Sequence, residues 1–236
     1  MTIRVSDLDA STRFYDTVLA TLGLEAWHSE LGVEWGDFSI SQADVEHPLT
    51  RRLHIAFFGP THAEVDELWR VGTEAGYRSD GEPGPRPQYS DSYYGSFLLD
   101  PDGNSVEAVY HDDDRERGSI DHLWIRVADV AASRRFYETI APYGRFHLGA
   151  DEPDRAQFVG DGGSFSVVAG EPTEHVHVAF PAAENETVEA FHRAALEAGY
   201  ESNGGPGERP IYHAGYYGAF VFDPDRSNVE VVNHNR

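Results

Sequence analysis

The chain has 236 residues, 40% of them apolar, which suits one large or two ordinary folded domains. It contains no cysteine, so disulfides and thiolate metal sites are excluded and any metal must be bound by His, Asp or Glu. A net charge of -23 disfavours nucleic acid and anionic membranes as partners, and the lack of a long apolar run or a leader-like N-terminus predicts a cytoplasmic protein.

The first predicted elements are a short strand over 2–5 and a helix for which Asp7 is the N-cap. Apolar residues recur at helical spacing through this segment, and Gly23 follows the last of them. Three extended runs come next, at 24–29, 33–36 and 38–42. The order is strand, helix and three strands.

The same order follows a second time. The sequence LHIAF (53–57) predicts a strand, and Thr61 with Glu64 forms a capping box for a helix that ends near Gly76. Three further extended runs are predicted around Tyr77 and over SFLL and SVEAVY. The first half of the chain is therefore expected to hold two modules of one kind.

The second half repeats the first. A shift of 123 residues takes LHIAF to VHVAF and DPDGNSVE to DPDRSNVE, and near the start a shift of 122 takes TIRVSDLDASTRFY to WIRVADVAASRRFY. The charged segment 111–119 lies between the copies and has the composition of a linker. We therefore predict two domains, 1–115 and 119–236, and four βαβββ modules.

These segments, together with DHLWIRVADV (121–130), resemble the vicinal oxygen chelate superfamily, which includes glyoxalase I, extradiol dioxygenases and bleomycin- and fosfomycin-resistance proteins. The resemblance covers nearly the whole chain and implies an α+β fold. It implies tandem domains whose four modules form two cupped half-barrel sheets. It also implies a small-molecule substrate and either a monomer, as an internal pseudo-dimer, or a homodimer.

The resemblance places metal ligands on three strands, which in the second half carry His122, His177 and Glu230. Two imidazoles and one carboxylate form a facial set that suits Fe(II) or Mn(II) and leaves positions open. In the first half the matching residues are His54 and Glu107, and the counterpart of His122 would stand one position before Met1. The sequence therefore predicts a complete site in the second half and a vestigial one in the first.

A histidine marks another difference between the halves. In extradiol dioxygenases a signature joins a His, a Tyr, an Asp-Pro pair and the Glu ligand, and His213 takes the place of that His here. The first copy has Ser90 instead. We predict that His213 is a general acid or base beside the open metal positions. Phe220 and Arg226 depart from the signature, since the Tyr and a small turn residue stand there in the family.

Other residues of the second half are candidates for the pocket wall. His175 is predicted to lie on the same strand face as His177, as a hydrogen-bond partner of a ligand or an alternative ligand. Arg209 is either a clamp for a substrate carboxylate or a structural loop residue. The remaining pocket candidates are Tyr217, Phe220 and His234.

Three functions follow from the resemblance. The first is a metal-dependent enzyme of the glyoxalase or extradiol-dioxygenase type, acting on a small substrate chelated through neighbouring oxygens. The fourth strand of the third module, SFSVVAG, lacks the further carboxylate that glyoxalases need, which disfavours that reaction. The alternatives are a binding protein of the bleomycin-resistance type without a metal, and a metal-dependent transferase of the fosfomycin-resistance type.

Overall fold

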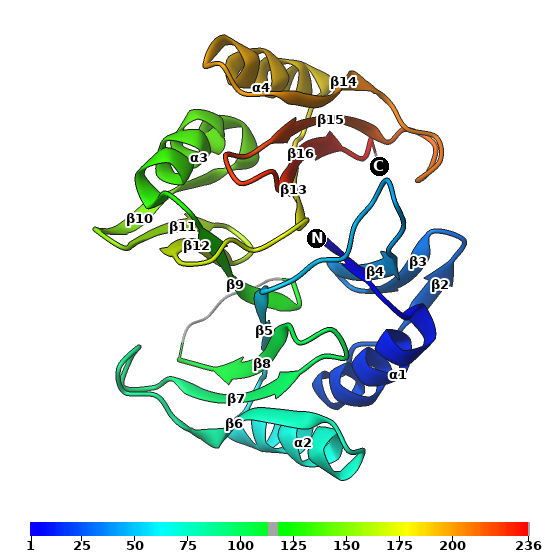
Figure 1. Ribbon diagram of the computed structural model, residues 1–236, viewed down its shortest axis with the longest axis vertical. Coiled ribbons are helices and arrows are strands. Elements are labelled where there is room, and N and C mark those ends of the chain that lie inside the picture. The colour runs from blue at the N-terminus through cyan, green and yellow to red at the C-terminus, as the bar shows by residue number, and fades with distance from the viewer. Residues whose placement is uncertain (113–117, 236) are drawn as a thin grey trace. The chain divides into compact units, whose positions relative to one another are not determined.

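The computed structural model describes residues 1–112 and 118–235, and Figure 1 shows their helices and strands along the chain. The first half contains β1 (Thr2–Val5), α1 (Leu8–Leu19), the 3-10 helix η1 (Ala20–Leu22), β2 (Trp27–Ser29), β3 (Gly32–Trp35), β4 (Phe38–Gln42), β5 (His54–Phe58), α2 (His62–Glu74), β6 (Arg78–Pro85), β7 (Tyr94–Leu99) and β8 (Ser105–Tyr110).

The second half contains β9 (Ile120–Val127), α3 (Val130–Gly144), β10 (Phe146–Glu152), β11 (Arg155–Gly160), β12 (Ser164–Ala169), β13 (His177–Pro181), α4 (Asn185–Glu197), β14 (Ser202–Glu208), β15 (Tyr217–Phe222) and β16 (Asn228–Asn233). The order strand, helix and three strands thus occurs four times in the described residues. Hydrogen bonds join these strands into two eight-stranded sheets. The predicted α+β fold of four βαβββ modules is confirmed.

The equivalent helices α1 and α3 both begin with an aspartate N-cap. The Asp7 carboxylate accepts a hydrogen bond from the Ala10 amide at 2.9 Å, as predicted for the N-cap of α1. Its repeat copy Asp129 accepts from the Ala132 amide at 3.0 Å at the start of α3. Gly23 follows η1 with a φ of 75°, a left-handed conformation that glycine adopts without strain.

The described residues divide into two compact units. The N-terminal unit comprises Thr2–Trp124 with Gly162–Ser164, and the C-terminal unit comprises Ile125–Asp161 and Phe165–Arg236 with Met1. The boundary therefore falls inside β9, whereas the sequence predicted it within the linker 111–119, of which 113–117 lie outside the described residues. Residues 119–124, predicted to open the second domain, are part of the N-terminal unit.

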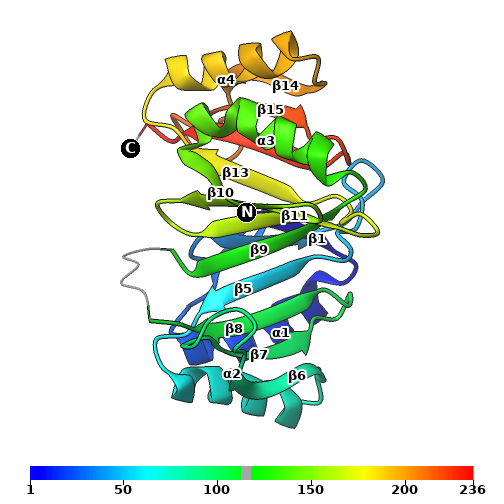
Figure 2. The same cartoon turned by 90° about the vertical axis from the view of Figure 1, so that its left-hand side faces the viewer.

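Strand pairing explains this boundary. Within the N-terminal unit, β5 pairs in parallel with β8 on one side and antiparallel with β9 on the other. The adjacent β5 and β9 can be followed in Figure 2. The hydrogen bonds of this ladder hold Ile120–Trp124 beside the second module, so the start of β9 extends that module's sheet.

Buried aromatic rings fill the core of each unit. In the N-terminal unit Tyr15 is fully buried, its ring lies 4.8 Å from that of Phe38, and its hydroxyl donates to Asp100 at 3.0 Å. In the C-terminal unit Tyr137 is equally buried and donates to Asp223 at 3.3 Å. Each tyrosine therefore fixes the Asp-Pro turn that leads into the last strand of its half. Those last strands carry Glu107 and Glu230.

Among the helices of the described residues, none combines the length and the hydropathy that crossing a membrane requires.

Candidate metal centre in the N-terminal unit

Two of the candidate residues face each other across parallel strands. In the register of β5 and β8, His54 lies opposite Ser105 and Ala56 lies opposite Glu107. The same face of the sheet therefore carries His54 and Glu107. The His54 Nε2 atom lies 2.9 Å from Glu107 Oε2, and only 1% of the Glu107 side chain is exposed.

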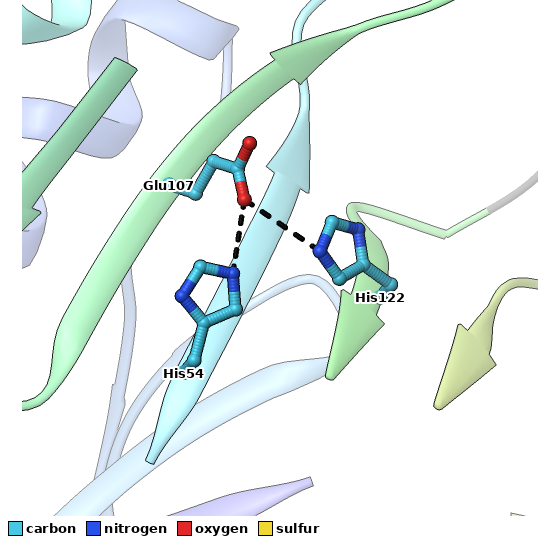
Figure 3. Close-up of side chains that lie close together, drawn as sticks. All are labelled: His54, Glu107 and His122. Carbon is cyan, nitrogen blue, oxygen red and sulfur yellow. Dashed lines mark hydrogen bonds and ion pairs between the residues drawn. The ribbon is translucent and has the colours of Figure 1, made fainter. Parts of the chain in front are cut away.

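A third residue reaches this pair from β9. The antiparallel register places His122 opposite Ala56, so Glu107, Ala56 and His122 form one row across three strands. The small side chain of Ala56 leaves space between the other two. His122 Nε2 lies 3.6 Å from Glu107 Oε2, as Figure 3 shows. One ligand atom from each of His54, Glu107 and His122 lies within 4.8 Å of the others.

The donor set fits a divalent metal ion. Both imidazoles direct Nε2 towards the same carboxylate oxygen, while their Nδ1 atoms contact other groups. Nδ1 of His54 lies 3.2 Å from Ser105 Oγ, and Nδ1 of His122 lies 2.8 Å from Asp121 Oδ1. Metal-binding imidazoles in proteins use the second ring nitrogen in this way, because that bond fixes the ring. This group of residues could therefore hold a metal.

The second oxygen of Glu107 is held by Tyr93, whose hydroxyl donates to Oε1 at 2.7 Å. Burial raises the pKa of Tyr93 far above its usual value, and the Glu107 carboxylate raises it further. The phenol therefore stays protonated and donates. Gly95 lies beside this contact, where a Cβ atom would stand 2.6 Å from Oε1. Glycine at this position leaves room for the carboxylate.

Asp121 is a further buried carboxylate of the site. Burial alone would raise the pKa of Asp121, but hydrogen bonds from His111 and His122 outweigh it and hold that pKa well below its usual value. His111 Nε2 lies 2.7 Å from Oδ2, on the oxygen that His122 does not contact. The Asp121 carboxylate is therefore ionised at neutral pH.

The predicted ligand set is corrected by this geometry. His122 was assigned to a site with His177 and Glu230, and His54 with Glu107 was expected to be vestigial. His122 instead contacts Glu107, because β9 pairs with β5. The group of three thus takes two members from the half that was predicted to be incomplete. The sequence placed His122 with the second half, whereas the structure places it beside the second module of the first half.

The C-terminal unit holds a related pair. His177 Nε2 lies 2.9 Å from Glu230 Oε2, and Tyr216 donates to Glu230 Oε1 at 2.6 Å. The Phe220 ring lies 6.0 Å from that of His177, and the Arg209 guanidinium lies 5.4 Å from the centre of the Phe220 ring. Arg209 also donates to two backbone carbonyl oxygens, those of Gly205 and Glu208, which favours the structural role considered for it.

His213 lies in the loop before β15 in this unit. Its Nε2 is 3.0 Å from Nδ1 of His234, and its Nδ1 is 2.8 Å from the carbonyl oxygen of Ala214. Both rings meet the ring of Tyr216 edge-on at 5.2 Å. His213 therefore belongs to the surroundings of Glu230, and its action as a general acid or base stays a prediction.

Two pocket candidates are placed differently from expectation. His175 was expected on the same strand face as His177, but β13 begins at His177, and His175 is an exposed bend residue with a φ of 54°. Tyr217 lies on β15 with its hydroxyl 3.1 Å from Glu189 of α4. The residue just before this strand, Tyr216, contacts Glu230 instead.

From the sequence, Tyr93 is expected to be a wall or core aromatic residue, and no role is predicted for Asp121. The sequence contains a feature that marks each of them: a repeat copy for Tyr93 and a neighbouring predicted ligand for Asp121. Tyr93 and its copy Tyr216 stand at the repeat shift of 123, each fourteen residues before a predicted glutamate ligand. Asp121 directly precedes His122, but that position has no copy in the first half, so the repeat did not draw attention to it.

Comparison with known proteins agrees with the fold. The model of the Glyoxalase/Bleomycin resistance protein/Dioxygenase superfamily matches residues 1–108 and 119–231. The chain therefore belongs to this superfamily. A search of curated proteins found no match.

Solved structures share the architecture. Glyoxalase I from Zea mays has a TM-score of 0.70 with 20% sequence identity, over 99% of this chain and 91% of that one. A protein from Bacillus subtilis, described as a candidate dioxygenase, has a TM-score of 0.69 with 13% identity, over 100% of this chain and 84% of that one. At these identities the likeness concerns the fold.

Proposed function

We propose that the protein is a metal-dependent enzyme of the glyoxalase or dioxygenase type. Its substrate would be a small molecule with two neighbouring oxygen atoms, bound at a metal held by His54, Glu107 and His122. The observation that carries this proposal is the convergence of two imidazole nitrogens on one buried carboxylate oxygen, at 2.9 and 3.6 Å. A bound metal would supply a Lewis acid and a meeting point for substrate and dioxygen.

The donor set favours Fe(II) or Mn(II) among the metals. Two histidines and one carboxylate are the ligands of many non-haem iron oxygenases, and three protein ligands leave coordination positions for the substrate. Tyr93 supports this arrangement by occupying Glu107 Oε1, which leaves Oε2 to face the imidazoles. The site would thus bind one metal and orient it by fixed hydrogen bonds.

Metal titration of two matched variants tests the proposal. Glu107→Gln and Glu230→Gln each remove one buried charge that contacts one tyrosine and at least one histidine. Wild-type apoprotein should bind one Mn(II) or, without oxygen, one Fe(II) per chain. Glu107→Gln should weaken binding by ~100-fold or more, because removing a ligand exceeds the usual effect of an outer partner. Glu230→Gln should bind as the wild type does.

Circular dichroism and thermal melting of both variants provide the control for folding. Tight binding of one ion by Glu107→Gln would contradict the proposal. A wild-type protein that binds neither ion at submillimolar concentration, yet binds small aromatic ligands, would support the sequestering function instead.

A further inference from the structure

The carboxylate of Asp121 lies between two imidazoles. Its Oδ1 atom is 2.8 Å from Nδ1 of His122, and its Oδ2 atom is 2.7 Å from Nε2 of His111. Asp121 is 5% exposed, and His111 follows the last residue of β8. The three side chains therefore connect the end of β8 to the start of β9, beside the candidate metal centre.

This arrangement determines the tautomer of His122. An ionised carboxylate can only accept hydrogen bonds, so Nδ1 of His122 carries the proton that faces Asp121. In a neutral imidazole the other nitrogen, Nε2, then has a free lone pair. Nε2 is the atom that faces Glu107 at 3.6 Å. Asp121 thus presents the unprotonated nitrogen of His122 to the centre of the group.

His54 is held differently. Its Nδ1 atom lies 3.2 Å from the Ser105 hydroxyl, which itself donates to Asp80 at 2.8 Å. Its Nε2 atom lies 2.9 Å from Glu107 Oε2, so both ring nitrogens of His54 face acceptors. Among the described residues, His122 has such a contact only at Nδ1, because its Nε2 lies 3.6 Å from Glu107, beyond hydrogen-bonding distance.

The repeat supplies an internal comparison. His234 is the copy of His111 at the shift of 123, and it lies 3.0 Å from His213. In that unit the imidazole contacts another imidazole, which can itself donate or accept. The histidine that contacts a carboxylate, His111, thus lies in the unit with the three-residue group. Its copy His234, which contacts an imidazole, lies in the unit that holds the pair of His177 and Glu230.

We propose that Asp121, itself held by His111, is a positioning residue that fixes the ring and tautomer of His122 for metal binding. This inference rests on the proposed metal site at His54, Glu107 and His122. Outer hydrogen-bond partners of metal-binding histidines contribute ~10–100-fold to metal affinity. Asp121 should lie in this range, and His111 should contribute less, because it acts through Asp121.

Mn(II) titration followed by electron paramagnetic resonance of the free ion tests this role. Asp121→Ala should bind Mn(II) ~10–100-fold more weakly than the wild type. Asp121→Asn should have an intermediate effect, because the amide oxygen still accepts from His122 while the amide nitrogen replaces the acceptor at His111. Of two matched histidine variants, His111→Gln should weaken binding and His234→Gln should not.

Nitrogen-15 spectra of the apoprotein separate positioning from a general structural role. The wild type should show His122, assigned with His122→Gln, protonated at Nδ1, and Asp121→Ala should show a mixture of tautomers. The inference is overturned if Asp121→Ala retains both the single tautomer and wild-type affinity, or if His234→Gln weakens binding as much as His111→Gln. A wild type that binds no Mn(II) would refute the metal site, while the tautomer spectra would still decide on Asp121.

Discussion

Two buried glutamates, Glu107 and Glu230, have almost the same surroundings. Each accepts from a tyrosine, at 2.7 and 2.6 Å, and each faces a histidine at 2.9 Å. Each also lies beside a glycine that leaves room for the carboxylate. The difference is His122, which reaches Glu107 from β9. The repeated sequence therefore builds a repeated pair, and the first strand of the second repeat copy converts the pair at Glu107 into a candidate metal centre.

The largest expected effect comes from removing that difference. His122→Ala reduces the group at Glu107 to a pair like that at Glu230, so Mn(II) affinity should fall by ~100-fold or more. His177→Ala should leave the affinity within about twofold of the wild type, because His177 contacts Glu230 and not Glu107. Isothermal titration calorimetry of both variants measures this. Equal losses in the two variants would show that the pair at Glu230 binds the metal.

A second comparison concerns the buried aspartates of the two Asp-Pro turns. Burial raises the pKa of Asp223 to about 6, whereas Asp100 receives an additional hydrogen bond from the Asn104 side chain at 3.0 Å. The folded pKa of Asp223 exceeds the unfolded value, so its stabilising contribution is present below about pH 4 and is lost as the pH rises through 6.

Asp223→Asn removes this titration. Its free energy of unfolding relative to the wild type should therefore increase from pH 4 to pH 7, by up to about 3 kcal/mol. Urea unfolding at several pH values measures the change. Asp100→Asn is the matched control and should show a smaller pH dependence, because Asn104 already favours the ionised form of Asp100. The comparison fails if the two variants respond equally to pH.

A smaller effect should follow from exchanging the residues that distinguish these turns. Ser227 is the copy of Asn104, and its buried Oγ atom makes no hydrogen bond within the described residues. Ser227→Asn would provide Asp223 with the amide donor that Asp100 has, and should stabilise the protein by about 1 kcal/mol at pH 7. Asn104→Ser should destabilise it by about 1–2 kcal/mol. Thermal melting checks both, and a destabilising Ser227→Asn would show that the second turn lacks space for the amide.

The smallest effect is expected at the preceding position of the same turns. Arg226 has a φ of 72°, where its copy Gly103 has 84°. Its guanidinium lies 3.8 Å from the centre of the Phe222 ring and pairs with Glu201. Arg226→Ala should destabilise by about 0.5–1 kcal/mol through loss of the ring contact. Arg226→Gly should restore about 1 kcal/mol of this by relieving the backbone, which leaves it near the wild type in chemical denaturation.

The modules, and the pairs of residues within them, follow from local features of the sequence. Asp7 and Asp129 cap equivalent helices through local hydrogen bonds, and the alternation of apolar residues marks the strands. His54 with Glu107, and His177 with Glu230, stand on the first and last strands of one module. These strands are parallel neighbours in each module, so a local repeat was enough to bring each pair together.

The position of His122, in contrast, depends on how distant strands pair in the folded chain. The apolar residues of the strand at 120–127 form one face, which could pack in a sheet beside any partner strand. Nothing in the residues of this strand specifies the sheet edge to which it adds. That choice depends on contacts between modules distant in sequence, which no local propensity encodes. The partner of β9 is β5, and the two strands are antiparallel. Their register places His122 opposite Ala56, one strand away from Glu107.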